Sequence, residues 1–390
     1  MTTLDERSIT PQAAQRARAQ YRIQRWTPLS AAATGTVVAL IVALAFVPAV
    51  LGTNITQQLT SLLILIILAV MWNALAGYSG LVSVGQQAYI GLGAYGAIYL
   101  TQQGVQPYVA MALAALAAGV VALPTSLLVL RLRAGQFAIG TWVVAEVFAL
   151  LIGLDQSLGG GTGISLTTLN VYSPSDRQSY TYWLTLGSAV VLLAAVFFLL
   201  RGRLGASLQA IRDDEEAAAS VGVPVMRTKR IVFVLAAAGC GAAGALTLAN
   251  TLFIQTQSVF GVQWSAYMIF IVLVGGLGTF EGPIIGAIAF YLIQNTFADF
   301  GAWYLVGLGA TAIGFALFLP RGLWGTVQAR WQLRLLPLGH VLHVVDSAAL
   351  AQMGRVPWWK GLRANAAQSP APDGGSGRAG SPRVDPNRGD

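Results

Sequence analysis

Apolar runs long enough to cross a membrane dominate this chain and restrict the folds open to it. A helix needs roughly 20 predominantly apolar residues to span the hydrocarbon core of a bilayer. Ten segments approach that length: residues 31–51, 59–76, 84–100, 108–130, 137–154, 182–200, 231–253, 265–277, 283–298 and 303–319. We predict a membrane-spanning helix for each, so the expected fold is an all-α membrane protein with about ten transmembrane helices.

The composition excludes a chain that buries its apolar residues in a water-soluble core. Hydrophobic residues make up 55% of the sequence and charged residues only 10%, whereas soluble domains carry about 25% charged residues. A single cysteine, Cys240, excludes a disulfide framework or a cysteine-based metal site. The two histidines, His340 and His343, lie outside the apolar runs, and we predict neither a metal site nor a cofactor.

The basic residues predict an orientation in the membrane. With ten spans, all of the 23 lysines and arginines except Arg177 fall on one side. Cytoplasmic loops carry an excess of lysine and arginine, so both chain ends are expected in the cytoplasm. The same rule accounts for the net charge of +8 without nucleic acid. The expected location is the inner, cytoplasmic membrane of a bacterium, with multiple passes.

Changes in composition divide the chain into four parts. Residues 1–30 form a basic, cytoplasmic N-terminal segment, and residues 31–328 form the membrane domain. Residues 329–363 read as an amphipathic or juxtamembrane segment. Residues 364–390 are rich in Pro, Gly, Ser and Arg, and we predict that they are disordered. Within the membrane domain, residues 155–181 are expected to form an irregular, water-facing loop.

The internal loop at residues 201–230 predicts a short helix–turn–helix. Leu204, Leu208 and Ile211 form an apolar stripe at helical spacing, and a run of acids follows. Gly222 and then Pro224 end the helical pattern. Composition alone leaves two interpretations open: an element that docks into a groove on a partner protein, or a solvated connection.

Motifs shift the balance towards docking. Glu216-Ala217-Ala218 followed by Gly222 matches EAAxxxG, the cytoplasmic signature of ABC importer permeases. Four further segments share a pattern with one branch of those permeases: AGYSGLVSVGQ at 76–86, GLGAY at 91–95, GGLGTFEGP at 275–283 and LPRGL at 319–323. Over roughly residues 35 to 328 the chain resembles the LivM-type permeases of branched-chain amino acid ABC transporters.

The resemblance implies a type II-like importer permease that works with a LivH-type permease, two ATPase subunits and a periplasmic binding protein. The element that couples to the ATPase would comprise Asp213, Asp214, Glu215, Glu216, Ala217, Ala218 and Gly222. Three departures stand out. The Ile-x-Leu-Pro ending of the signature is absent, Gln86 replaces a frequent histidine, and no arginine soon follows Glu146. Branched-chain amino acids are the expected cargo, and urea or short amides remain an alternative.

Two features are candidates for the translocation path. Glu146 is the one acid near the middle of a predicted span, where a carboxylate costs about 2.5 to 3.5 kcal/mol. It is expected to face protein or a water-filled path, either as a path or gating residue or as a structural hydrogen-bonding group. The second feature is the glycine-rich segment 77–96 with Ser83, Gln86, Gln87 and Tyr89. It can form a broken helix that lines a polar cavity or a closely packed helix, and we favour packing.

The remaining motifs limit the function class. The sequence has no GxxxxGK[ST] phosphate-binding loop, no HExxH and no Ser-His-Asp set, so we expect a transport subunit and not an enzyme. A secondary transporter is less favoured, because that class uses ionisable residues at the membrane midplane and only Glu146 is available. The other polar groups in the spans are neutral, including Asn73, Asn250, Gln294 and Asn295. They favour an uncharged or zwitterionic cargo.

Overall fold

The computed structural model describes residues 21–24, 28–160, 162–297, 300, 302–319, 321–331 and 341–344. They fall into two units. One contains a two-stranded antiparallel sheet of β1 (Tyr21–Gln24) and β4 (Val341–Val344), with Arg22 opposite His343. The other, residues 26–339, contains the helices. The predicted disordered tail at 364–390 lies outside the described residues, as does most of the segment 329–363.

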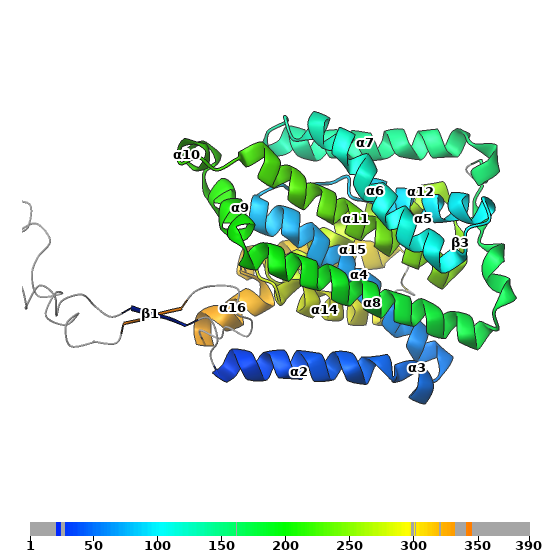
Figure 1. The fold of residues 1–390 in the computed structure, drawn as a ribbon, viewed down its shortest axis with the longest axis horizontal. Helices are drawn as coiled ribbons and strands as arrows, with labels where there is room; N and C mark the ends of the chain where they lie inside the picture. The colour runs from blue at the N-terminus through cyan, green and yellow to red at the C-terminus, as the bar shows by residue number, and fades with distance from the viewer. Residues whose placement is uncertain are drawn as a thin grey trace, which may run out of the picture. The chain divides into compact units, whose positions relative to one another are not determined.

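The helical unit consists almost entirely of long apolar helices (Figure 1). Its helices are α2 (Pro28–Ala45), α3 (Val47–Val50), α4 (Thr53–Ser79), α5 (Gln87–Gln102), α6 (Pro107–Val129), α7 (Ala134–Leu154), η1 (Gln156–Leu158), η2 (Thr167–Val171), α8 (Pro174–Arg201), α9 (Arg203–Asp213), α10 (Glu215–Ser220), α11 (Val225–Thr251), α12 (Thr256–Val259), α13 (Gln263–Gly275), α14 (Gly282–Phe297), α15 (Ala302–Phe318) and α16 (Gly322–Trp331). Two short strands, β2 (Ile164–Ser165) and β3 (Phe253–Ile254), pair antiparallel.

Helices α4 and α11 form the centre of the bundle. Helix α11 packs against α4, α5 and α6, and α4 packs against α8, α13 and α14. Small residues allow these close approaches: a Cβ on Gly244 of α11 would lie 1.9 Å from the carbonyl oxygen of Ile90 in α5. Close packing of this kind holds helices together in lipid, where apolar burial contributes little. The core is therefore built around two helices far apart in the sequence.

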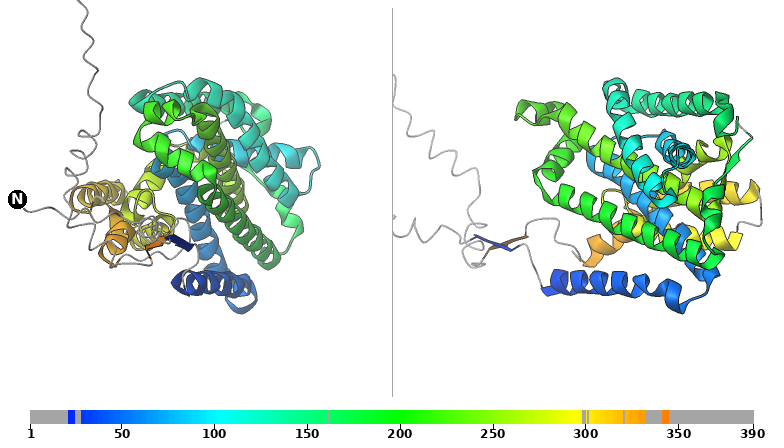
Figure 2. Two further views of the ribbon diagram at one scale, coloured as in Figure 1. Left: turned by 60° about the vertical axis from the view of Figure 1, so that its left-hand side comes forward. Right: turned by 45° about the vertical axis from the view of Figure 1, so that its right-hand side comes forward.

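The outer helices expose their apolar side chains. Helix α2 lies beside the bundle and stays separate from it along most of its length (Figure 2). Only its C-terminal end is tied to α8, where Tyr182 Oη donates to the Leu44 carbonyl at 2.8 Å and Trp183 Nε1 to the Ala45 carbonyl at 3.0 Å. Helices α7 and α15 are also largely exposed. In a membrane such surfaces contact lipid or other subunits.

All ten predicted segments coincide with helices. Among the described residues, seven stretches are long and apolar enough to cross a membrane, and two shorter apolar helices lie at 32–45 and 282–297. The all-helical membrane class is therefore confirmed. Ten crossings with both termini in the cytoplasm remain a prediction.

Helix α8 begins eight residues earlier than the hydrophobic pattern predicts, at Pro174 instead of Tyr182. Ser173 is its N-cap, and the Ser173 hydroxyl accepts a hydrogen bond from Asp176 N at 3.2 Å. Proline at the first helical position adds a preorganised start. The preceding loop is irregular, as expected, and is held by the pairing of β2 with β3.

The chain between α4 and α5 is irregular, with no helix from residue 80 to 86. Side chains from neighbouring helices bind its polar backbone groups. Trp72 Nε1 donates to the Ser83 carbonyl at 2.8 Å, and Val84 N donates to Thr141 Oγ1 at 3.3 Å. A helix break therefore precedes a closely packed α5, and residues 77–96 are absent from the lining of the cavity described below.

Candidate functional site

Three motif segments meet at the C-terminal end of α4. A Cβ on Gly77 would lie 2.6 Å from the backbone nitrogen of Gly278, and a Cβ on Gly322 would lie 2.6 Å from Cα of Gly276. Only glycine allows these backbones to come so close. We call Gly77, Gly276, Gly278 and Gly322 the glycine junction. It joins the motifs at 76–86, 275–283 and 319–323, and its first and last members, Gly77 and Gly322, are 245 residues apart in the sequence.

Asn73 binds the glycine junction with both ends of its amide. Its Nδ2 donates to the Thr279 carbonyl at 2.8 Å, and its Oδ1 accepts from Gly278 N at 2.9 Å. The side chain is buried within α4. Breaking either hydrogen bond would leave a buried polar group without a partner, which is costly. The Asn73 amide therefore attaches the turn between α13 and α14 to α4.

Arg212, at the end of α9, reaches the same place from the internal loop. Its Nη1 donates to the Gly77 carbonyl at 2.8 Å. Its Nε and Nη2 lie 3.2 and 3.1 Å from Oδ1 of Asp213, which orients the guanidinium. The Gly77 carbonyl belongs to the last turn of α4, where carbonyls lack partners within the helix. Arg212 therefore caps α4 from another element.

The internal loop has the predicted helix–turn–helix form, and α10 lies at one tip of the bundle (Figure 1). Asp214 is the N-cap of α10 and accepts from Glu216 N and Ala217 N at 2.9 and 3.0 Å. Gly222 follows α10 with a φ of +86°, which confirms the expected turn. Leu208 and Ile211 are buried, as their spacing predicts.

The acids of the loop have different surroundings. Glu215 Oε2 lies 2.6 Å from Nζ of Lys229, whose side chain is 9% exposed. Glu216 is exposed, Ala218 is buried, and Val221 at the end of α10 is 78% exposed. The outer face of α10 thus presents an acid and an uncovered apolar side chain at the tip.

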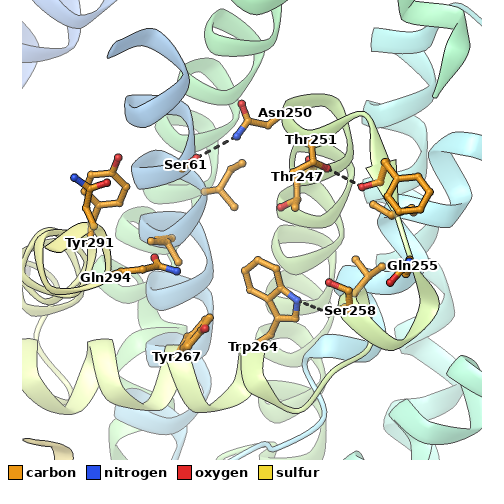
Figure 3. Close-up of a pocket in the computed structure, with 16 residues that line it drawn as sticks. Ser61, Thr247, Asn250, Thr251, Gln255, Ser258, Trp264, Tyr267, Tyr291 and Gln294 are labelled. Atoms are coloured by element: carbon orange, nitrogen blue, oxygen red, sulfur yellow. Dashed lines mark hydrogen bonds between the residues drawn. The ribbon is translucent and has the colours of Figure 1, made fainter. Parts of the chain in front are cut away.

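Figure 3 shows a cavity of about 660 Å³. Its lining includes residues of α12 and β3, which lie at the end of the bundle opposite α10 (Figure 1). Helices α4, α11, α12, α13 and α14 and strand β3 form its wall. The lining residues are Ser61, Ile64, Leu65, Thr247, Asn250, Thr251, Phe253, Ile254, Gln255, Ser258, Val259, Trp264, Tyr267, Tyr291, Gln294 and Asn295. The volume lies within the range of small-molecule sites, roughly 300 to 1,000 Å³.

The cavity wall is polar without being charged. None of the described residues that line it is an Asp, Glu, Lys or Arg. Asn250 Nδ2 on α11 donates to Ser61 Oγ on α4 at 3.1 Å, and Trp264 Nε1 donates to the Ser258 carbonyl at 3.0 Å (Figure 3). Amides and hydroxyls both donate and accept hydrogen bonds. Asn250, Gln294 and Asn295 were identifiable from the sequence as polar residues in apolar runs, but their convergence was not.

The predicted path residues of the glycine-rich segment are buried inside the protein and do not line this cavity. Ser83, Gln86 and Gln87 are fully buried. Ser265 Oγ donates to Gln87 Oε1 at 2.5 Å, which ties α5 to the helix that carries Trp264. Tyr89 Oη bonds Thr125 Oγ1 at 2.7 Å. Gln86 Nε2 donates to Ser83 Oγ at 3.3 Å, so the structure brings these two residues together, while Gln87 contacts α13 and Tyr89 contacts α6.

Glu146 lies apart from all of these residues. It is on the exposed side of α7, and its Oε1 accepts from Trp142 Nε1, one turn away, at 3.0 Å. Among the described residues, Glu146 is exposed on that face of α7. The carboxylate therefore points out of the described part of the chain and towards whatever surrounds it in the membrane.

Residues 54–320 match the protein family described as the branched-chain amino acid transport system permease component. The chain belongs to this family. The permease is 29% identical over 324 residues to the high-affinity branched-chain amino acid transport system permease protein LivM of Escherichia coli, covering 76% of each chain. It is 29% identical over 322 residues to the LivM protein of Salmonella typhimurium, covering 76% of this chain and 75% of that protein.

A probable LivM permease of Methanocaldococcus jannaschii is 23% identical over 168 residues, 42% of this chain and 48% of that one. No solved structure matches the permease. The family match and the apolar helices identify a multi-pass membrane protein that is the permease component of an ABC importer and is not an enzyme by itself. As such it works with a second permease, ATPase subunits and a binding protein.

Proposed function

We propose that the permease carries branched-chain amino acids through the cavity, as one half of the pore of a bacterial inner-membrane importer. Its partners are a LivH-type permease, two ATPase subunits and a periplasmic binding protein. The observation that carries the proposal is the uncharged polar cavity at the end of the bundle opposite α10. If α10 faces the cytoplasm, the cavity lies towards the side from which a binding protein delivers its cargo.

The chemistry of the cavity suits a zwitterion with an apolar side chain. Ile64, Leu65 and Val259 offer an aliphatic surface, while Asn250 and Gln294 offer amides. An amide donates to a carboxylate and accepts from an ammonium group, so neutral groups can bind both ends of an amino acid. A fixed charge in the wall would favour one end over the other. The same amides would accept urea or a short amide, which is the second candidate cargo.

The energy for transport comes from a partner in this proposal. The permease has no nucleotide-binding loop of its own in the sequence. We place the ATPase contact at residues 213–218 and Gly222, with exposed Val221 and Glu216 entering a groove on the ATPase. Two of the acids have structural tasks as well, since Asp214 caps α10 and Glu215 pairs with Lys229.

Glu146 is assigned to the boundary with the second permease. A carboxylate in lipid near the middle of a span costs about 2.5 to 3.5 kcal/mol, and Trp142 alone offsets little of that cost. Cover by another subunit, or water at the boundary, removes the cost. Ser83, Gln86 and Gln87 are assigned to the support of the cavity wall, through the bond between Gln87 and Ser265.

The test is uptake of labelled leucine by vesicles that contain the complete transporter, with isoleucine, valine or urea as competitors. Competition by isoleucine and valine supports branched-chain amino acids, and urea uptake without leucine uptake supports the second cargo. Asn250→Leu keeps the size of the side chain and removes its amide from the cavity. Asn54→Leu makes the same change at an exposed position of α4.

We expect Asn250→Leu to weaken leucine uptake about tenfold, because a lost hydrogen bond of about 1 to 1.5 kcal/mol corresponds to roughly that factor. Asn54→Leu should transport at the wild-type rate. Equal uptake by both variants would show that the cavity is not part of the translocation path.

A further inference from the structure

The cavity and the glycine junction share three helices. Helix α4 carries Ser61 in the cavity wall and Gly77 in the junction. Those residues are 16 positions apart, so a rise of about 1.5 Å per residue separates them by roughly 24 Å along the helix. Helices α13 and α14 carry Trp264 and Gln294 in the cavity wall and are connected to each other by the turn in the junction. A displacement at the junction therefore moves several walls of the cavity together.

The turn between α13 and α14 moves with α4 because Asn73 binds it at two points. The two hydrogen bonds, to the Thr279 carbonyl and from Gly278 N, leave no free end on the Asn73 amide. The close approach of Gly77 to Gly278 removes the space into which the turn could slide. Helices α4, α13 and α14 are thus joined into one rigid unit at this end of the bundle.

Arg212 is the side chain through which the internal loop binds this rigid unit. It belongs to α9, which leads directly into α10, and it bonds the Gly77 carbonyl at 2.8 Å. Its Nη1 also lies 3.2 Å from where a Cβ of Gly278 would stand, so the guanidinium covers both sides of the junction. Asp213 holds the other guanidinium nitrogens and so fixes the direction of the side chain.

We propose that Arg212 is the positioning residue that transmits movement of α9 and α10 to α4, α13 and α14, three of the helices that line the cavity. The inference rests on the proposed docking of α10 to an ATPase. When α10 moves, α9 moves with it because the two helices are consecutive in the chain. Arg212 then displaces the end of α4 through its bond to the Gly77 carbonyl. Helices α13 and α14 follow because Asn73 of α4 binds the turn between them. Asp213, predicted from the sequence as an ATPase contact, then acts on the guanidinium of its neighbour.

The test is the number of solute molecules imported per ATP hydrolysed by the complete transporter in vesicles. Arg212→Met removes every side-chain donor, Arg212→Gln replaces the guanidinium by the neutral amide of a shorter side chain, and Arg212→Lys retains a cationic N–H donor. Arg203→Gln is the matched control, since Arg203 is exposed on the same helix. Retention of the ATPase subunits on the purified permease is measured for every variant.

We expect Arg212→Gln and Arg212→Met to retain the ATPases and hydrolyse ATP, with solute per ATP at least about fivefold lower, the small end of typical coupling between sites. Arg212→Lys should recover part of the loss, and Arg203→Gln should match wild type. Unchanged solute per ATP, loss of the ATPases, or absence of both variants from the membrane would overturn the proposal. If the wild-type complex itself lacks ATP-driven uptake or bound ATPases, the proposed function fails instead.

A covalent link offers a second measurement. A Cβ on Gly80 would lie 3.8 Å from Cβ of Arg212, within the range of about 3.5 to 4.5 Å found in disulfides. Cys240, the single native cysteine, is buried and does not compete. The double variant Gly80→Cys/Arg212→Cys should therefore be uncoupled when reduced and should regain solute per ATP when oxidised. Gly80 has a φ of +71°, so a cysteine there is strained and the informative result is the one obtained once the disulfide has formed. A disulfide that leaves transport uncoupled would contradict the link.

Discussion

Substitutions at Gly222 should weaken ATPase binding in an order set by the backbone and not by side-chain size. Gly222 has a φ of +86°, and a Cβ built there meets nothing within 4 Å. Steric contact thus contributes nothing, and the whole penalty comes from holding an L-residue at positive φ. That penalty is about 1 to 2 kcal/mol for an ordinary residue, smaller for asparagine and larger for a β-branched residue.

The magnitude follows from the population of the native turn. If the ATPase binds only the native turn, its apparent affinity falls in proportion to the fraction of permease that retains it. A cost of about 1.4 kcal/mol corresponds to a tenfold change. We therefore expect Gly222→Ala to weaken binding by up to about 5- to 30-fold, Gly222→Asn by less and Gly222→Val by more.

The assay is titration of the purified permease with the ATPase subunit, together with uptake in vesicles. The expected order of affinity is Gly, Asn, Ala, Val, with all four proteins at equal levels in the membrane. An order that follows side-chain volume, with asparagine worse than alanine, would refute the backbone argument. Unchanged affinity and uptake in Gly222→Val would show that this loop is not the docking element.

Three further changes have definite expected outcomes. Glu146→Gln should insert normally but alter the rate or pH dependence of uptake, and wild-type values for both would leave Glu146 a packing residue. Gly244→Ala places a Cβ 1.9 Å from the Ile90 carbonyl oxygen and should lower stability in detergent by about 1 to 3 kcal/mol or more, whereas Gly187→Ala, which meets nothing, should not. A thermal melt that shows equal stability for both alanine variants would contradict the close packing of α5 on α11. Ending the chain after Gln352, outside the described residues, should leave uptake near wild type, and complete loss of uptake at normal membrane levels would contradict this.

The helices were predictable because hydrophobicity over roughly 20 residues is a local property of the sequence. The turn at Gly222 and the burial of Leu208 and Ile211 were predictable for the same reason, since glycine placement and helical spacing are local. The early start of α8 was also encoded locally, in Ser173 and Pro174. The apolar pattern missed it because the first turns of α8 are polar.

The cavity could not be predicted, because it depends on contacts between distant segments. Ser61 and Asn250 are 189 residues apart and share one hydrogen bond across it. The sequence identifies Asn250 as a polar residue in an apolar run but contains no information on its pairing with Ser61. Arg212 was hidden in the same way, since its partner at Gly77 is 135 residues away. Glu146 was identified by its charge, while its exposure on α7 depends on which helices pack beside it.

The central claim is that ATP hydrolysis by partner subunits drives a solute through a pore to which this permease contributes one half. The most direct test compares labelled leucine uptake into vesicles that contain the permease alone with uptake into vesicles that also contain the second permease, the ATPases and the binding protein. The account predicts no uptake by the permease alone, with or without an ion gradient, and ATP-dependent uptake by the full assembly. Uptake by the permease alone that follows an ion gradient would contradict it and identify a secondary transporter.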